Sequence, residues 1–206
     1  ILEVSILSNS FLDMSKSIYE YQQSLEEKVE QRTKELNIKN EELFKLSITD
    51  KLTGLYNRVK LDSVLKENMS LSLRYGNIFS VIIIDIDFFK KINDNFGHQV
   101  GDDVLKECSY ILSQNIRNVD TLGRWGGEEF LVVCQETLKD GAKDLAIKLN
   151  KAIKLHKFST YPHSVTISVG VASCSVNDLN YDDIISNADK ALYEAKNNGR
   201  DRVEIF

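Results

Sequence analysis

Two aspartates stand at the end of a strongly apolar segment. Asp85 and Asp87 follow the run VIII at residues 81–84, which is typical of a buried central strand. Because side chains alternate along a strand, both carboxylates would lie on one face, at the end of the strand where ligand sites form in α/β sheets. Buried carboxylates need a compensating cation, and a divalent metal ion would provide one. The simpler alternative is that one of the two aspartates caps the helix that follows.

A second pair of acids follows two glycines. Gly126 and Gly127 separate two short β-type runs and predict a hairpin, because glycine permits positive φ and leaves room against the backbone. Glu128 and Glu129 come next, and a strand cannot bury both of two adjacent side chains on one face. Taken alone, residues 126–130 leave two interpretations open: a ligand site, or a plain turn with solvated acids.

Five segments together resemble the signature of the GGDEF-domain diguanylate cyclases. Residues 126–130, GGEEF, are a variant of the motif that names this family. The other four segments, in the family's order, are DKLTGLYNR at 50–58, DIDFFKKIND at 85–94, the GH and GD pairs at 97–98 and 101–102, and ALYEAKNNGR at 191–200. The chain departs from the family pattern at Asp201, where asparagine is usual.

The resemblance implies a nucleotidyltransferase that condenses two GTP molecules into cyclic di-GMP and releases two pyrophosphates. Its catalytic domain would resemble the palm of nucleotide polymerases and class III adenylate cyclases. By motif position, Asp85 and Glu129 would bind Mg²⁺, or Mn²⁺, with the carbonyl of Ile86 completing the shell. Glu128 would assist deprotonation of the attacking 3′-hydroxyl or contact a second metal ion, and the sequence leaves these roles open. Asp85, Glu128 and Glu129 are the expected catalytic residues.

The same motifs imply where the nucleotide binds. Asn93 and Asp102 would recognise guanine, because a carboxylate can accept the N1 and N2 protons that adenine does not offer. The groups expected to hold the phosphates are the backbone amides of Phe88 and Phe89 at a helix start, and the side chains of Lys90, Lys196 and Arg200. Without the resemblance, Lys196 and Arg200 would simply be bases at a helix C-terminus, where the helix dipole favours them.

An RxxD motif lies just before the expected hairpin. Arg117 and Asp120 stand where the family has its inhibitory site, so the resemblance implies product inhibition by cyclic di-GMP. Arg117 would bind a phosphate or stack on guanine, and Asp120 would accept hydrogen bonds from a guanine edge. Lys143 and Lys148 are the nearby bases where relatives often use a further arginine. A surface ion pair is the alternative.

Residues 1–46 contain neither glycine nor proline and predict a long helix. The two heptad series are Phe11, Ile18, Leu25, Arg32, Lys39 and Leu46, and Val29, Leu36 and Leu43. A parallel coiled coil is expected, with polar residues interrupting one seam. A single solvated helix is the alternative.

A coiled coil would give a homodimeric enzyme its geometry. Each domain would hold one GTP, and the 3′-hydroxyl of each must face the α-phosphate of the other, so the spacing of the domains would control the rate. The segment around Glu3, Val4, Leu7, Phe11 and Met14 resembles the end of a HAMP signalling module, which would imply an upstream sensor. The alternative is an amphipathic helix and nothing more.

Residues 47–206 predict an α/β domain with a mixed central sheet flanked by helices. A polar join at 47–57 precedes it. The expected helices span 58–69, 102–115, 138–156 and 183–197, and the expected strands span 79–86, 121–125, 128–134, 165–172 and 202–206. A hairpin within a βα alternation argues against a doubly wound sheet.

Composition narrows the class of protein. The chain has 206 residues, 31 acidic and 26 basic, and its net charge of −5 argues against a nucleic-acid partner. Three widely spaced cysteines, Cys108, Cys134 and Cys174, fit buried thiols in a reducing compartment rather than disulfides or a zinc site. No apolar run approaches the about 20 residues that span a bilayer. Because the sequence begins at Ile1, we expect a fragment of a longer bacterial protein, its catalytic domain cytoplasmic, with an inner-membrane anchor elsewhere as an open alternative.

Two rival functions remain open at this stage. One is a catalytically silent receptor for GTP or cyclic di-GMP, and the other is a purely dimeric signalling scaffold. The presence of Asp85, Glu128 and Glu129 favours the enzyme over the silent receptor. The guanine and phosphate residues argue against the scaffold.

Overall fold

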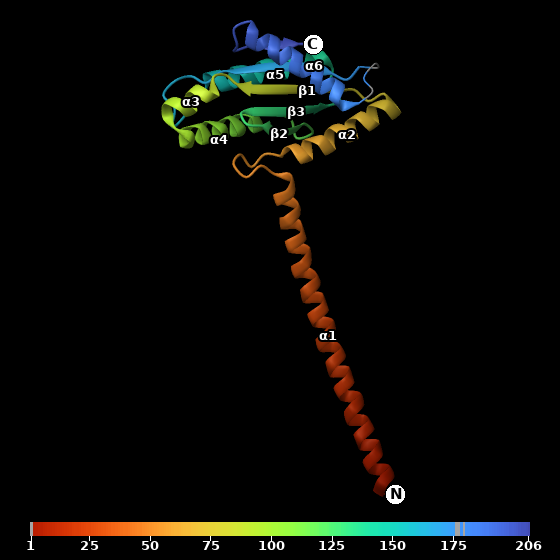
Figure 1. Ribbon diagram of the computed structural model, residues 1–206. Coiled ribbons are helices and arrows are strands. Elements are labelled where there is room, and N and C mark those ends of the chain that lie inside the picture. Colours follow the sequence, from red (N-terminus) through yellow and green to blue (C-terminus); the bar gives the residue numbers. More distant parts are fainter. Residues whose placement is uncertain (1, 176–177, 179) are drawn as a thin grey trace. The chain divides into compact units, whose positions relative to one another are not determined.

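The amino-terminal part of the chain is one long helix. The computed structural model describes residues 2–175, 178 and 180–206, and contacts divide the chain into units of residues 1–46 and 47–206. Helix α1 runs from Leu2 to Ile48 (Figure 1). The apolar seam residues with described side chains are exposed in this single chain: Phe11, Ile18, Leu25, Val29, Leu36, Leu43 and Leu46. Of the residues behind the HAMP resemblance, Glu3, Val4 and Leu7 have side chains outside the described residues, and Phe11 and Met14 are exposed. No helix among the described residues is both long and apolar enough to cross a membrane.

Residues 47–206 form the predicted mixed sheet with helices on both faces. The five strands are β1 (Phe79–Ile86), β2 (Thr121–Gly126), β3 (Glu129–Gln135), β4 (Ile167–Ser173) and β5 (Val203–Ile205). Their order in the sheet is β2-β3-β1-β4-β5. Strand β1 is antiparallel to β3 and β4, β2 is antiparallel to β3, and β4 is parallel to β5. The fold class expected from the sequence is confirmed.

Strand β1 lies at the centre of the core. All eight of its residues are buried, and the side chains of its six apolar residues alternate between two apolar clusters. Ile82 and Ile84 pack with residues of α3 (Phe89–Phe96), α4 (His98–Asn115) and α5 (Lys139–Leu155). Val81 and Ile83 pack with residues of α2 (Arg58–Tyr75) and α6 (Tyr181–Asn197) on the other face. A continuous apolar run therefore appears in the sequence because both faces of the strand are covered.

Helix α6 lies directly against β4. A Cβ at Gly170 would stand 2.1 Å from the carbonyl oxygen of Ala188 and 2.4 Å from the amide nitrogen of Leu192. Only glycine permits this approach of two backbones. The close packing places the C-terminal end of α6, which carries Lys196, beside the end of the central sheet.

The largest departures from the sequence-based expectations concern helices α2, α3 and α4, and the ends of the other elements differ by two residues or fewer. A helix start was expected at Phe88 and Phe89 but without a range for α3, and α4 begins at His98 rather than Asp102. Gly97 alone joins the two helices, with a φ of 85° that glycine adopts readily. Helix α2 continues past Met69 to Tyr75 and ends where Gly76 adopts a left-handed conformation. Its last turns are mostly exposed, so the pattern of buried apolar residues did not reveal them.

The prediction of buried thiols holds for two of the three cysteines and is wrong for Cys174. Cys108 and Cys134 are buried free thiols, and Cys174 is partly exposed. Burial raises the pKa of Cys134 to about 12 and also raises the pKa of Cys108. Neither buried thiol is therefore a reactive nucleophile at neutral pH.

Candidate active site

Two carboxylates lie side by side at one end of the sheet. Asp85 near the end of β1 pairs with Glu129 at the start of β3 in the antiparallel register. Residues directly opposite each other in such a pair have their Cβ atoms about 5 Å apart on one face. Asp85 is buried, with 7% of its surface exposed, and Glu129 is half-buried. The sheet thus brings together two acids that are far apart in the sequence.

Burial disfavours the ionised form of both carboxylates. Burial raises the pKa of Asp85, although the ammonium group of Lys196, whose Nζ lies 2.8 Å from Asp85 Oδ2, opposes the shift. Burial also raises the pKa of Glu129, and the charge of Asp85 raises it further. A cation between them would relieve both effects.

The donor set fits a small hard cation. No group of three or more His, Cys, Asp or Glu side chains among the described residues gathers into a metal site. Two carboxylates with further ligands from backbone, water or phosphate oxygens are the usual protein contribution to a nucleotide-bound Mg²⁺. The pair Asp85 and Glu129 therefore fits such an ion when phosphates are present to complete its shell.

Asp87 has a structural role rather than the ligand role that its spacing suggested. Its buried carboxylate accepts hydrogen bonds from Thr166 Oγ1 at 2.7 Å, Ser168 Oγ at 2.6 Å and the backbone N–H of Asp201 at 3.0 Å. These bonds tie the end of β1 to β4 and to the loop after α6. The helix-cap alternative is also wrong, because α3 has no side-chain cap and begins after Phe88.

Arg124, which lies outside the predicted site residues, holds the glycine turn. Arg124 donates from Nε and Nη2 to the carbonyl oxygen of Gly127, at 2.9 and 2.7 Å. Its Nη1 also contacts both carboxylate oxygens of Asp50 at 3.3 Å. Arg124 therefore links residues 50–58 to the turn that presents Glu128 and Glu129. The signal available in the sequence was an arginine just before the Gly-Gly pair together with an unassigned aspartate in the DKLTGLYNR segment.

This link predicts a pH-dependent contribution to stability. Burial alone would raise the pKa of Asp50, but hydrogen bonds from Thr53 and the charge of Arg124 outweigh it and hold the pKa below its ordinary value. The ionised carboxylate thus stabilises the fold above that ordinary value, and the contribution disappears as pH falls through the lowered pKa. Asp50→Asn is expected to lower the melting temperature by about 2–4 °C at pH 7 and by less near pH 3. Thermal unfolding of Asp50→Asn and of the control Asp62→Asn checks this, and an equal loss at both pH values would reject the ion pair.

The residues expected to recognise guanine lie together where α3 meets α4. A Cβ at Gly101 would stand 1.9 Å from Asn93 Oδ1 and 3.2 Å from Cζ of Phe89, so the Asn93 side chain occupies the space that the glycine leaves. Asp102 follows Gly101 in α4, and both Asn93 and Asp102 are partly exposed. The structure thus brings Asn93 and Asp102 into one neighbourhood.

The basic residues expected to bind phosphate differ in whether they lie near the paired carboxylates. Lys196 contacts Asp85, and the charge of Arg200 also opposes the rise in the pKa of Asp85 that burial causes. Lys90 is exposed in the first turn of α3, and none of the contacts among the described residues places it at the carboxylates. The amides of Phe88 and Phe89 stand at the N-terminus of α3 as expected.

The RxxD residues form a local pair away from the carboxylates. Arg117 Nε lies 3.1 Å from Asp120 Oδ2, and Arg117 Nη2 donates to Thr137 Oγ1 at 2.6 Å. The Asp120 side chain is completely buried, whereas that of Arg117 is 57% exposed. Arg117 and Lys148 line a hollow of about 510 Å³, but Lys143 is not among its residues. In this structure Asp120 orients Arg117, and Arg117 is the group that a ligand would meet.

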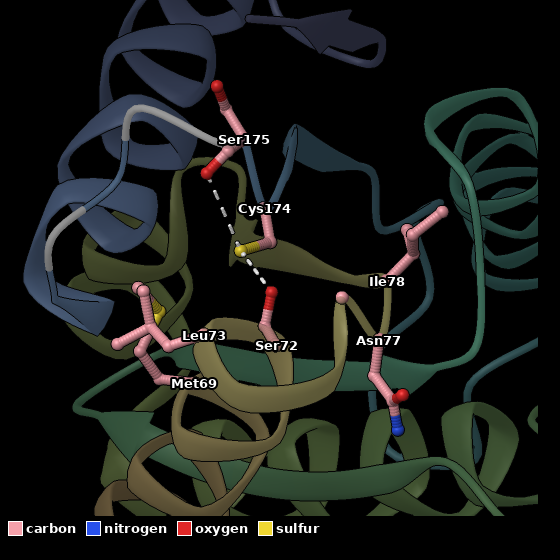
Figure 2. Close-up of a pocket in the computed structure, with 8 residues that line it drawn as sticks. Met69, Ser72, Leu73, Asn77, Ile78, Cys174 and Ser175 are labelled. Atoms are coloured by element: carbon pink, nitrogen blue, oxygen red, sulfur yellow. Dashed lines mark hydrogen bonds between the residues drawn. The ribbon is translucent and has the colours of Figure 1, made fainter.

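A different hollow lies at the opposite end of β1 (Figure 2). It has a volume of about 240 Å³ and lies between the end of α2 and Cys174, whose Sγ lies 3.2 Å from Ser72 Oγ. Its lining contains no charged side chain. It therefore lacks the cations that a triphosphate needs, and the acidic end of the sheet is the candidate site.

A mixed sheet with paired carboxylates, a lysine and an arginine at one end defines an α/β domain suited to a phosphorylated ligand and a metal ion. The particular family follows from sequence comparison. The profile of the family described as "Diguanylate cyclase, GGDEF domain" matches residues 47–202. The chain belongs to this family, whose diguanylate cyclases generally use divalent metal ions.

Relatives support the same assignment. The chain is 36% identical over 203 residues to "Diguanylate cyclase A" of Treponema denticola, covering 96% of this chain and 53% of the relative. It is 38% identical over 166 residues to "Diguanylate cyclase" of Vibrio cholerae, covering 81% of this chain and 52% of the relative. The chain thus spans about half the length of these two curated relatives.

Solved structures resemble both parts of the chain. The coiled coil and GGDEF domain of DgcB from Caulobacter crescentus in complex with c-di-GMP matches with a TM-score of 0.81 at 27% identity, over 89% of this chain and 100% of that chain. The active GGEEF domain of a diguanylate cyclase from Vibrio cholerae matches with a TM-score of 0.70 at 37% identity, over 73% of this chain and 96% of that chain.

Proposed function

We propose that this chain is a diguanylate cyclase that condenses two GTP molecules into cyclic di-GMP and two pyrophosphates. The observation that carries the proposal is the pairing of Asp85 with Glu129 across β1 and β3, with Lys196 at 2.8 Å from Asp85. These three groups come from three separate motifs of the family signature. Their meeting at one point supports a retained catalytic site rather than a silent one.

The proposed ligands of Mg²⁺ or Mn²⁺ are Asp85, Glu129 and the backbone carbonyl of Ile86. When bound, the ion would supply positive charge to the triphosphate. Lys196 and Arg200 would bind phosphate oxygens, as would the amides of Phe88 and Phe89 at the start of α3.

Glu128 precedes Glu129 and is partly exposed in the turn. We assign it to the attacking side of the reaction, where its carboxylate accepts the proton of a 3′-hydroxyl or contacts a second metal ion. Because Arg124 holds the carbonyl of Gly127, the turn that presents Glu128 is fixed before substrate arrives.

Asn93 and Asp102 are proposed to select guanine. Gly101→Ala is expected to raise the KM for GTP about tenfold or more with a smaller change in kcat, because the new methyl group displaces the Asn93 side chain. Steady-state kinetics measure the split, and Ser186→Ala serves as a control at an exposed position within α6. An unchanged KM would remove Asn93 from nucleotide recognition.

The reaction needs two chains. Each domain would hold one GTP, so the 3′-hydroxyl and the α-phosphate of one bond come from different chains. The exposed apolar stripe of α1 is proposed to pair with a second copy as a coiled coil. An upstream sensor in the full-length protein would then act through α1.

Product inhibition is assigned to Arg117, with Asp120 orienting it. Arg117→Ala is expected to raise the concentration of cyclic di-GMP needed for half-inhibition by about tenfold or more, because a charge-assisted contact to the product is lost. Initial rates with added product measure this, with Lys143→Ala as the control base outside the hollow. Inhibition at the original concentration would show that the product binds elsewhere.

A chain-terminating substrate tests the arrangement. We expect a mixture of GTP and 3′-deoxy-GTP to yield a linear dinucleotide triphosphate, because 3′-deoxy-GTP offers an α-phosphate but no attacking hydroxyl and cannot close the ring. Mass-resolved chromatography detects this product. Binding of GTP without any dinucleotide would favour the silent receptor.

A further inference from the structure

Phe88 adopts a backbone conformation that a bulky residue rarely accepts. Its φ of 57° and ψ of 25° lie in the left-handed region, and it caps α3 without a side-chain hydrogen bond. Such conformations are costly for residues other than glycine, asparagine and aspartate. Phe88 is also 51% exposed, so burial of its ring gives only partial compensation. Local stability alone would favour asparagine or glycine at this position.

The ring of Phe88 has two cationic neighbours. The Cζ atom of Arg200 lies 4.6 Å from the ring centroid, and Lys91 Nζ lies 4.5 Å from it. Both distances fall within the range of cation–π attraction. The ring thus lies against one basic side chain from the loop after α6 and one from α3.

Arg200 has few other contacts to fix its side chain. Among the described residues its guanidinium forms no salt bridge with a carboxylate, and its one hydrogen bond to protein runs from Nη1 to the carbonyl of Lys196 at 3.4 Å. Its backbone and that of Asp201 also have positive φ, of 64° and 49°. The backbone of this loop is anchored, because the N–H of Asp201 donates to Asp87. The Phe88 ring is therefore the principal contact that orients the guanidinium.

We propose that the Phe88 side chain is a positioning residue that holds the guanidinium of Arg200 ready for the triphosphate. This inference rests on the proposed function, because it takes GTP as the ligand of Arg200. The backbone amide of Phe88 has a separate part in the same site. The left-handed conformation serves both, since it presents the amide at the N-terminus of α3 and turns the ring toward the loop after α6.

Asparagine at position 88 separates the two contributions. It tolerates the left-handed conformation and keeps the amide, but it lacks the ring. Phe88→Asn should therefore fold at least as stably as the unaltered chain, while its dissociation constant for the triphosphate rises about three- to tenfold. Phe88→Tyr retains a ring, and its dissociation constant is expected to stay within about twofold of that of the unaltered chain.

A double-mutant cycle tests whether the ring acts through Arg200. The dissociation constant of the α,β-methylene analogue of GTP is measured by calorimetry for the unaltered chain, Phe88→Asn, Arg200→Ala and the double variant, and melting temperatures are measured alongside. We expect Phe88→Asn to have no further effect once Arg200 is alanine, because the ring would have no guanidinium to hold. Lys91→Ala is the matched control for the other cation on the ring and should leave binding unchanged.

Each alternative result is decisive. Equal losses from Phe88→Asn in both backgrounds, or no loss in either, would overturn the inference. So would a failure of Phe88→Tyr to restore binding. If the unaltered chain binds the analogue but Arg200→Ala does not weaken it, this inference fails while the proposed function stands. If the unaltered chain does not bind the analogue, both fail.

Discussion

Replacement of Glu129 by glutamine is expected to lower the rate of cyclic di-GMP formation by about a thousandfold or more. Glutamine keeps the shape of the side chain but removes one of the two carboxylate charges at the end of the sheet. Two carboxylates are the protein's main contribution to an ion that must also hold phosphates, so the loss of one removes most of the charge stabilisation. The rate is measured from product separated by mass-resolved chromatography, with Glu67→Gln in α2 as the control.

The same variant has an opposite effect on stability. Burial, together with the charge of Asp85, raises the pKa of Glu129, so its ionisation at neutral pH opposes folding in the absence of metal. Glutamine cannot ionise, and Glu129→Gln should melt at an equal or higher temperature in metal-free buffer at pH 7. Undiminished product formation would remove Glu129 from catalysis, and a large fall in melting temperature would make its role structural.

Replacement of both Leu36 and Leu43 by aspartate is expected to reduce specific activity about tenfold or more at nanomolar protein. Both leucines are exposed in the single chain and belong to one heptad seam of α1. Charges in a coiled-coil seam oppose pairing, and the reaction needs two domains at once. The loss should shrink as protein concentration rises, because mass action restores the encounter.

Sedimentation and specific activity across a dilution series measure this effect together. Ile38→Asp is the control, because Ile38 is an exposed apolar residue of α1 outside both seams. Unchanged activity and unchanged mass for the double variant would reject the role of α1 in dimerisation. An equal loss from Ile38→Asp would point to general damage to the helix.

The predictable parts of the fold are the elements whose sequence pattern matches the way in which their residues are buried. The apolar run ending at Ile86 predicted β1 because helices cover both faces of that strand. The Gly-Gly pair predicted the hairpin because Gly127, with a φ of 20°, stands in the tight turn between β2 and β3. Helix α3 was harder to predict, because its eight residues are mostly polar and it is separated from α4 by Gly97 alone.

The candidate site was predictable by motif, but its internal contacts were not. Asp85 and Asp87 have the same residue type and strand parity, yet Lys196 contacts the first and three hydrogen-bond donors occupy the second. This difference depends on β4 and on the loop after α6, which lie far away in the sequence. The roles of Arg124 and of the Phe88 ring likewise depend on contacts between distant segments.

Counting the products of the unaltered chain tests directly whether it is a diguanylate cyclase. Purified chain is incubated with GTP and Mg²⁺, and cyclic di-GMP and pyrophosphate are quantified in the same reaction. We expect cyclic di-GMP, with two pyrophosphates released for each molecule formed. GTP that is bound yet unchanged, or converted only to GDP and phosphate, would contradict it.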